Sequence, residues 1–100
     1  MPFHVIYKPL AQLEAATAHE WYSQAHIGMG DDFLDELKRT NDFLSRNPHL
    51  YPCIEVEMRR ANVSRFPYSL FFVIDDDTVN VLSCFHQHRD PKSRNEFLKP

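Results

Sequence analysis

Residues 10–48 read LAQLEAATAHEWYSQAHIGMGDDFLDELKRTNDFLSRNP, and this stretch decides the fold. In its first half, small and aromatic residues recur at alternating spacings of four and three, which is the period of one face of an α-helix. These residues are Ala11, Ala15, Ala18, Tyr22 and Ala25. The triplet GMG at residues 28–30 then ends the helix, because glycine readily adopts the left-handed conformation of a C-terminal cap.

A second helix follows the glycines directly. Asp31 or Asp32 can cap its N-terminus, where the helix dipole also favours negative charge. Its apolar face comprises Phe33, Leu37 and Leu44. The pair NP at residues 47–48 stops it, because the residue before a proline avoids helical geometry. The sequence therefore predicts a helical hairpin with a three-residue turn.

Short β-patterned segments flank the hairpin on both sides. Residues 3–7 (FHVIY) are aromatic and β-branched, and residues 54–59 alternate apolar with charged side chains, which predicts one strand with a wet face. Residues 68–74 (YSLFFVI) are apolar on both faces, which is typical of a central strand. The acidic triplet at residues 75–77 predicts a turn, so residues 78–85 are expected to pair back as a hairpin strand.

The resulting order is β-α-α-β-β-β, an α+β fold in a single domain spanning residues 1–100. We expect the helical hairpin to pack on one face of a small, mainly antiparallel sheet and to leave the other face partly open. Residues 93–98 are expected to form a short terminal helix.

Composition narrows the functional classes. The chain has 43% hydrophobic and 25% charged residues and a net charge of −3, so it carries no overall positive field for nucleic acid. No apolar run in it is long enough to span a membrane, and we expect no signal peptide. Cys53 and Cys84 form neither a disulfide framework nor a zinc-binding pair, which favours a reducing, cytoplasmic location.

Four arginines from neighbouring strand segments are candidates for one binding patch. They are Arg59, Arg60, Arg65 and Arg89. Planar guanidinium groups bind phosphate bidentately and stay charged at any relevant pH, so the patch would bind phosphate or an acidic partner. The alternative is that these side chains form ordinary surface ion pairs with neighbouring carboxylates.

Cys84, His86 and His88 share one face of the last strand. Same-face side chains of a strand are about 7 Å apart, which is too wide for all three to reach one ion, and no fourth ligand is evident. We therefore expect no metal site. His86 beside an arginine cluster is a candidate acid or base, because the pKa of histidine lies near neutrality. No glycine-rich phosphate loop is present, and no cofactor is expected.

Several motifs resemble those of the RelE/ParE toxin superfamily over nearly the whole chain. In the helical half they are LEAA at 13–16, EWY at 20–22, GMG at 28–30, FLDEL at 33–37 and NP at 47–48. In the strand half they are RRA at 59–61, RFPY at 65–68 and CFHQHRDP at 84–91. The most specific pieces are RFPY, at the start of the central strand, and the HxxRDP pattern at the end of the last strand.

The resemblance implies a toxin of a type II toxin–antitoxin module of the plasmid-stabilisation type. RelE-like members cut mRNA in the ribosome, whereas ParE-like members inhibit DNA gyrase. Both are neutralised by a cognate antitoxin whose disordered tail folds across the toxin. A homodimer or a toxin–antitoxin hetero-oligomer is therefore expected, with no membrane partner.

The same resemblance assigns candidate residues for RNA cleavage. Arg65 and Arg89 would stabilise the phosphorane, and His86 would transfer a proton. However, no tyrosine follows Tyr68 to serve as the C-terminal tyrosine of RelE-like nucleases, and nuclease-branch toxins are usually basic. These departures favour the ParE-like branch and gyrase as the target. The alternatives are a ribosome-dependent mRNA interferase and a degenerate module that only binds its antitoxin, so enzymatic activity stays undecided.

Overall fold

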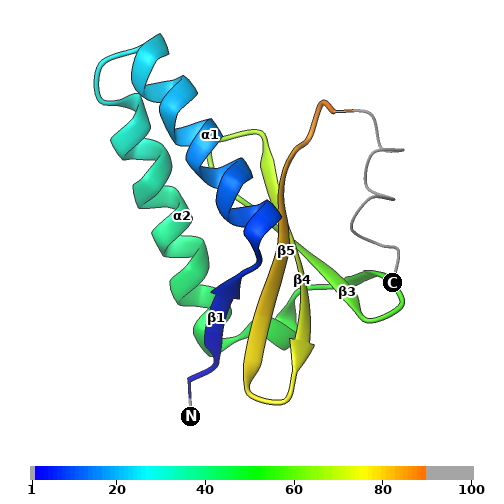
Figure 1. Ribbon diagram of the computed structural model, residues 1–100. Helices are drawn as coiled ribbons and strands as arrows, with labels where there is room; N and C mark the ends of the chain where they lie inside the picture. The colour runs from blue at the N-terminus through cyan, green and yellow to red at the C-terminus, as the bar shows by residue number, and fades with distance from the viewer. Residues whose placement is uncertain (1, 90–100) are drawn as a thin grey trace.

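The computed structural model describes residues 2–89, and it confirms the α+β class. The order along the chain is β1 (His4–Tyr7), α1 (Pro9–Ala25), α2 (Met29–Arg46), a 3₁₀ turn η1 (Pro48–Leu50), β2 (Cys53–Glu55), β3 (Met58–Asn62), β4 (Tyr68–Asp75) and β5 (Thr78–His86). Both helices lie on the same side of the sheet (Figure 1). The terminal helix expected over residues 93–98 lies outside the described residues.

The helical hairpin is present, but its turn comes two residues earlier than predicted. Pro9 begins α1 at a position where its missing N–H costs nothing, and residues 26–28 form the turn. Gly28 carries the left-handed backbone, with φ +82°, and is the N-cap of α2. The capping role predicted for Asp31 or Asp32 is therefore wrong, and both lie in the first turn of α2, where they favour the positive end of the helix dipole.

Gly30 lies inside α2 and serves close packing. A Cβ atom at this position would overlap Ser23 Oγ and lie 3.0 Å from Ser23 Cβ. The absence of a side chain at Gly30 thus lets α1 and α2 approach each other near the turn.

The sheet has five strands in the order β1-β5-β4-β3-β2. Strand β1 pairs in parallel with β5, and every other neighbouring pair is antiparallel. The single strand predicted over residues 54–59 is wrong: β2 and β3 form a tight hairpin that turns at Val56 and Glu57. Glu57 adopts φ +62°, which permits the reversal without a glycine.

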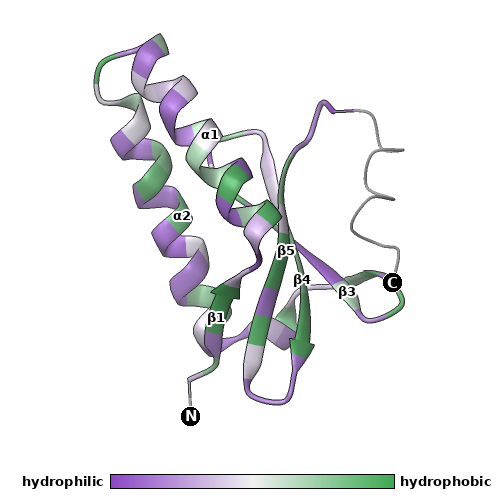
Figure 2. Ribbon diagram, in the orientation of Figure 1, coloured by the Kyte–Doolittle hydropathy of each residue, from purple (hydrophilic) through white to green (hydrophobic). Residues whose placement is uncertain are grey.

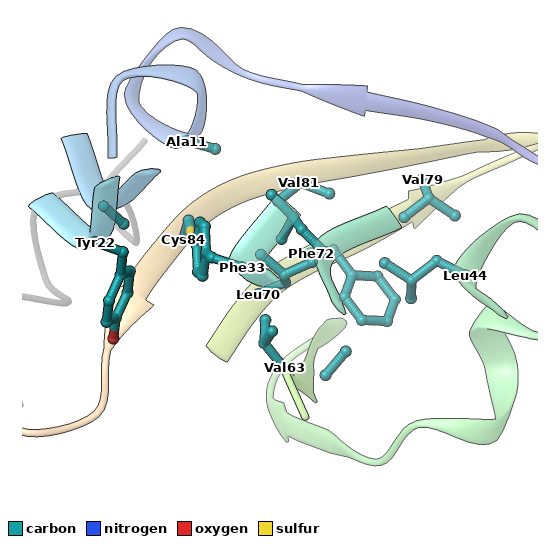
Figure 3. Packing of buried hydrophobic residues seen from close by; sticks show 13 residues of the cluster. Ala11, Tyr22, Phe33, Leu44, Val63, Leu70, Phe72, Val79, Val81 and Cys84 are labelled. Atoms are coloured by element: carbon teal, nitrogen blue, oxygen red, sulfur yellow. The ribbon is translucent and has the colours of Figure 1, made fainter. Parts of the chain in front are cut away.

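The main core lies between the helices and the sheet (Figure 3). Leu44 of α2 lies near Phe72 of β4 and Val79 of β5 toward one end of this core, and Phe33 lies toward the other end with Tyr22 and Cys84. In Figure 2, α2 carries both hydrophobic and hydrophilic patches, as expected of a helix with one buried face. Packing of this amphipathic face on the sheet fixes the position of the hairpin.

The face of the sheet away from the helices is covered in part. Met58, Phe71 and Phe85 form a second buried cluster there, whereas Arg60, which pairs with Phe71, is exposed. The ring centroids of Phe71 and Phe85 lie 5.6 Å apart in an edge-to-face arrangement.

Candidate functional site

A groove of about 820 Å³ runs between α1 and the outer half of β5. We call it the α1–β5 groove. Its lining residues come from α1, the start of α2, the segment before β4 and the end of β5. They are Leu10, Leu13, Glu14, Thr17, Ala18, Trp21, Tyr22, Met29, Pro67, Tyr68, Cys84, His86 and Arg89.

The α1 side of the groove carries an exposed apolar stripe. Leu10, Leu13 and Trp21 lie three and eight residues apart, which places them along one side of the helix. Leu13 is 65% exposed and Trp21 is 63% exposed. Single exposed apolar residues are common on protein surfaces, but large side chains aligned along a groove mark an interaction site.

Glu14 links α1 to β5 at the floor of this groove. Its Oε1 accepts hydrogen bonds from Ser83 Oγ at 2.6 Å and from the backbone N–H of Cys84 at 3.0 Å. Its Oε2 accepts a hydrogen bond from Arg89 Nη2 at 2.9 Å. Only 11% of the Glu14 side chain is exposed. Sequence reasoning missed this residue, because its partners lie 69 to 75 positions away and no local pattern connects them.

Arg89 closes one end of the groove. Besides its ion pair with Glu14, its guanidinium carbon lies 4.2 Å from the centroid of the Phe85 ring, which is cation–π geometry. The side chain stays 43% exposed, so further N–H groups of the guanidinium are available to a ligand. Arg89 is thus both anchored and accessible.

His86 lines the same end of the groove and is neutral at pH 7. Burial, together with the nearby His88 and Arg89, lowers the pKa of His86 below its ordinary value. Its Nδ1 accepts a hydrogen bond from the backbone N–H of His88 at 3.1 Å, so the ring proton is on Nε2. The Nε2–H of His86 can therefore donate a hydrogen bond to a ligand in the groove. For general acid catalysis, His86 would first have to take up a second ring proton.

The buried thiol of Cys84 has no reactive character. Burial and the neighbouring Glu14 carboxylate raise its pKa to about 12, which keeps it protonated at neutral pH. Cys84 contributes an apolar wall to the groove.

The four candidate arginines do not gather on one face. Arg59 lies on the helix-side face and donates through Nη1 to the backbone carbonyls of Tyr51 and His49, so it braces the η1 segment. Arg60, the next residue of the same strand, points to the opposite face. Arg59 and Arg60 therefore do not share one patch, because adjacent strand residues alternate between faces.

Arg65 and Arg89 each lie beside a different carboxylate: Asp32 for Arg65 and Glu14 for Arg89. Arg65 follows β3 with a backbone φ of +71°, and its Nη2 lies 4.0 Å from Asp32 Oδ2 at the start of α2. Both side chains of that pair are more than half exposed, so the pair is weak and readily exchanged for another anion. Of the proposed nuclease set, His86 and Arg89 share the α1–β5 groove, whereas Arg65 is not among the residues that line it.

Within residues 2–89, no group of three or more His, Cys, Asp or Glu side chains is placed to hold a metal ion. The helices there also lack the combination of length and apolar character needed to cross a membrane. The α1–β5 groove is therefore the feature on which a functional argument rests.

Comparison with solved structures identifies the class of fold. Ten chains match, and among them is a chain from a structure described as "Chromosomal ParDE TA system from P. aeruginosa", with a TM-score of 0.71. The alignment covers 84% of this chain and 95% of that chain at 13% sequence identity. No protein-family model and no curated protein sequence matches. The fold implied by the resemblance to the RelE/ParE superfamily is thus confirmed.

Proposed function

We propose that this chain is the toxin of a type II toxin–antitoxin pair of the ParE-like branch, and that its antitoxin binds in the α1–β5 groove. The observation that carries the proposal is the groove itself, on a fold shared with a chain of a ParDE toxin–antitoxin system. Its exposed stripe of Leu10, Leu13 and Trp21 offers apolar area that a partner would bury.

The partner segment should be amphipathic. The distance from Leu10 to Trp21 along α1 is eleven residues, or about 16 Å at the helical rise of ~1.5 Å per residue. A segment of about three helical turns would cover that length and place its apolar side on the stripe. Its polar side would meet Arg89 and His86 at one end of the groove.

DNA gyrase is the proposed target of the free toxin. Two features of the sequence favour it over mRNA: the net charge of −3 and the lack of a tyrosine after Tyr68. The geometry adds a third argument, because Arg65 and Arg89 are each beside a carboxylate and only Arg89 shares the groove with His86. An acid–base site for RNA cleavage would need these groups together and at least one cation unpaired.

The test is controlled expression in a bacterial host, with and without the protein encoded by the neighbouring gene. Growth arrest with DNA-damage signalling, relieved by the neighbour, supports a gyrase-directed toxin. In vitro, the purified protein should block supercoiling by gyrase and leave ribosome-bound mRNA intact. Arrest with cleaved mRNA would instead identify an interferase, and the absence of arrest together with tight antitoxin binding would identify a binding module.

A further inference from the structure

The outer half of β5 is an edge of the sheet. Strand β1 pairs with β5 only from Thr78 to Val81, because β1 ends at Tyr7 and the chain then enters α1. Within the described chain, no strand lies beside residues 82–86 on this side. An edge of this kind is ordinarily a template for another strand, either from a partner or from a second copy.

Backbone groups along this edge of β5 already have hydrogen-bond partners within the same chain. The backbone N–H of Cys84, which points outward from the edge, donates to Glu14 Oε1 at 3.0 Å, and the hydroxyl of Ser83 donates to the same oxygen at 2.6 Å. Farther along, the carbonyl of His86 accepts a hydrogen bond from the backbone N–H of Arg89 at 3.0 Å. A strand added here would have to break these bonds before it could form its own.

The same carboxylate fixes a cation. Glu14 Oε2 holds Arg89 Nη2 at 2.9 Å, and this contact keeps the guanidinium over the Phe85 ring. Glu14 thus engages the edge with one oxygen and Arg89 with the other, while 89% of its side-chain surface is withdrawn from solvent.

We propose that Glu14 is a positioning residue with two effects: it closes the outer edge of β5 against strand addition, and it fixes Arg89 at the end of the α1–β5 groove. A partner then enters the groove through side-chain contacts, as an amphipathic helix, and not by extending the sheet. The statement about the partner rests on the proposed function. The statement about Glu14 rests on the chain alone.

The test on the free protein uses NMR spectroscopy of E14A and E14Q. In E14A, the Cys84 amide should exchange with solvent at least tenfold faster, since it loses its acceptor. In E14Q, the side-chain carbonyl still accepts from Cys84, so protection should stay within about threefold of wild type. The ring-current shift that Phe85 imposes on the Arg89 side chain should disappear in both variants, because neither retains the charge.

Glu20 supplies the matched control, since it is an exposed glutamate of the same helix that bonds only Gln24 within α1. E20Q should leave both signals unchanged. An unchanged Cys84 exchange rate in E14A, or a retained Arg89 ring-current shift in E14Q, would overturn the proposal. Should E14A not fold, the Arg89 shift in E14Q still decides whether Glu14 fixes Arg89.

The partner arm uses the full-length complex with the protein encoded by the neighbouring gene. Helical carbon shifts in the groove-bound segment, with the Cys84 amide still protected, support the inference. Cross-strand nuclear Overhauser contacts between that segment and residues 82–86 would overturn it. If the neighbour does not bind, the proposed function fails, and the measurements on free E14A and E14Q still decide the role of Glu14.

Discussion

Trp21→Ala is the sharpest test of the α1–β5 groove. Trp21 is 63% exposed, and a tryptophan can bury up to about 250 Å² in an interface, so about 150 Å² remains for a partner to cover. At ~25 cal/mol per Å² this area corresponds to about 4 kcal/mol as an upper bound. Ordering of the side chain and of the partner consumes part of it, which leaves about 2 kcal/mol. We therefore expect the Kd for the antitoxin to rise about 30-fold.

The assay is isothermal titration calorimetry with the antitoxin encoded by the neighbouring gene. Ile27→Ala is the matched control, because Ile27 lies in the turn between α1 and α2, is 96% exposed and does not line the groove. The ring centroids of Trp21 and Tyr22 lie 5.0 Å apart in an edge-to-face arrangement. Loss of this contact in Trp21→Ala should lower the free energy of unfolding by no more than about 1 kcal/mol. A Trp21→Ala variant that binds as tightly as Ile27→Ala would refute the assignment of the groove.

Three further substitutions or treatments test other parts of the argument. Arg89→Ala should reduce toxicity on expression and lower the free energy of unfolding by about 1–2 kcal/mol in thermal melts, since the variant loses the ion pair with mostly buried Glu14 and the contact with the Phe85 ring. Iodoacetamide at pH 8 should alkylate exposed Cys53 at least tenfold faster than Cys84, by mass spectrometry, because burial shields the Cys84 thiol and raises its pKa to about 12. Gly30→Ala should destabilise the fold by about 1–2 kcal/mol in urea, because overlap with Ser23 outweighs the gain in helix propensity.

For each of these three predictions, one experimental result would contradict it. Full toxicity of the Arg89→Ala variant would place the working surface elsewhere. Equal alkylation of both cysteines in the native protein would contradict the burial of Cys84. For Gly30, the added Ser23→Ala substitution removes the overlapping Oγ without loss of helix propensity, so it should recover part of the lost stability; a double variant no more stable than Gly30→Ala alone would argue against the close approach of the helices.

The helical hairpin could be predicted because its signals are local. The apolar periodicity of α2 and the proline after it act within a few residues of each other. The exact place of the turn could not be predicted, because Gly28 and Gly30 are two residues apart and look alike in sequence. One provides a left-handed backbone and the other provides room for a neighbouring helix, and only packing distinguishes these uses.

The β2–β3 hairpin shows a second limit. Residues 54–59 alternate correctly for one strand, and no glycine or asparagine marks a turn. The reversal occurs at Val56 and Glu57, with Glu57 in a left-handed conformation that its sequence does not signal. Alternation continues through a two-residue turn, so the period alone cannot separate one strand from two.

The candidate site was predictable only in part. That His86 and Arg89 lie near each other could be expected, because they are three positions apart, and both line the α1–β5 groove. Glu14 could not be chosen, since its role depends on the packing of α1 across β5. The face on which Arg59 lies could not be predicted, because the strand boundary that sets its direction depends on the unsignalled turn at residues 56–57.

The parallel pairing of β1 with β5 has a consequence for how the protein is made. Strand β1 finds its neighbour 74 residues later along the chain, since His4 pairs with Thr78. Closing so long a loop carries an entropic cost. During synthesis, β1 therefore cannot join the sheet until β5 has left the ribosome, whereas the β2–β3 and β3–β4 pairs do not depend on that step.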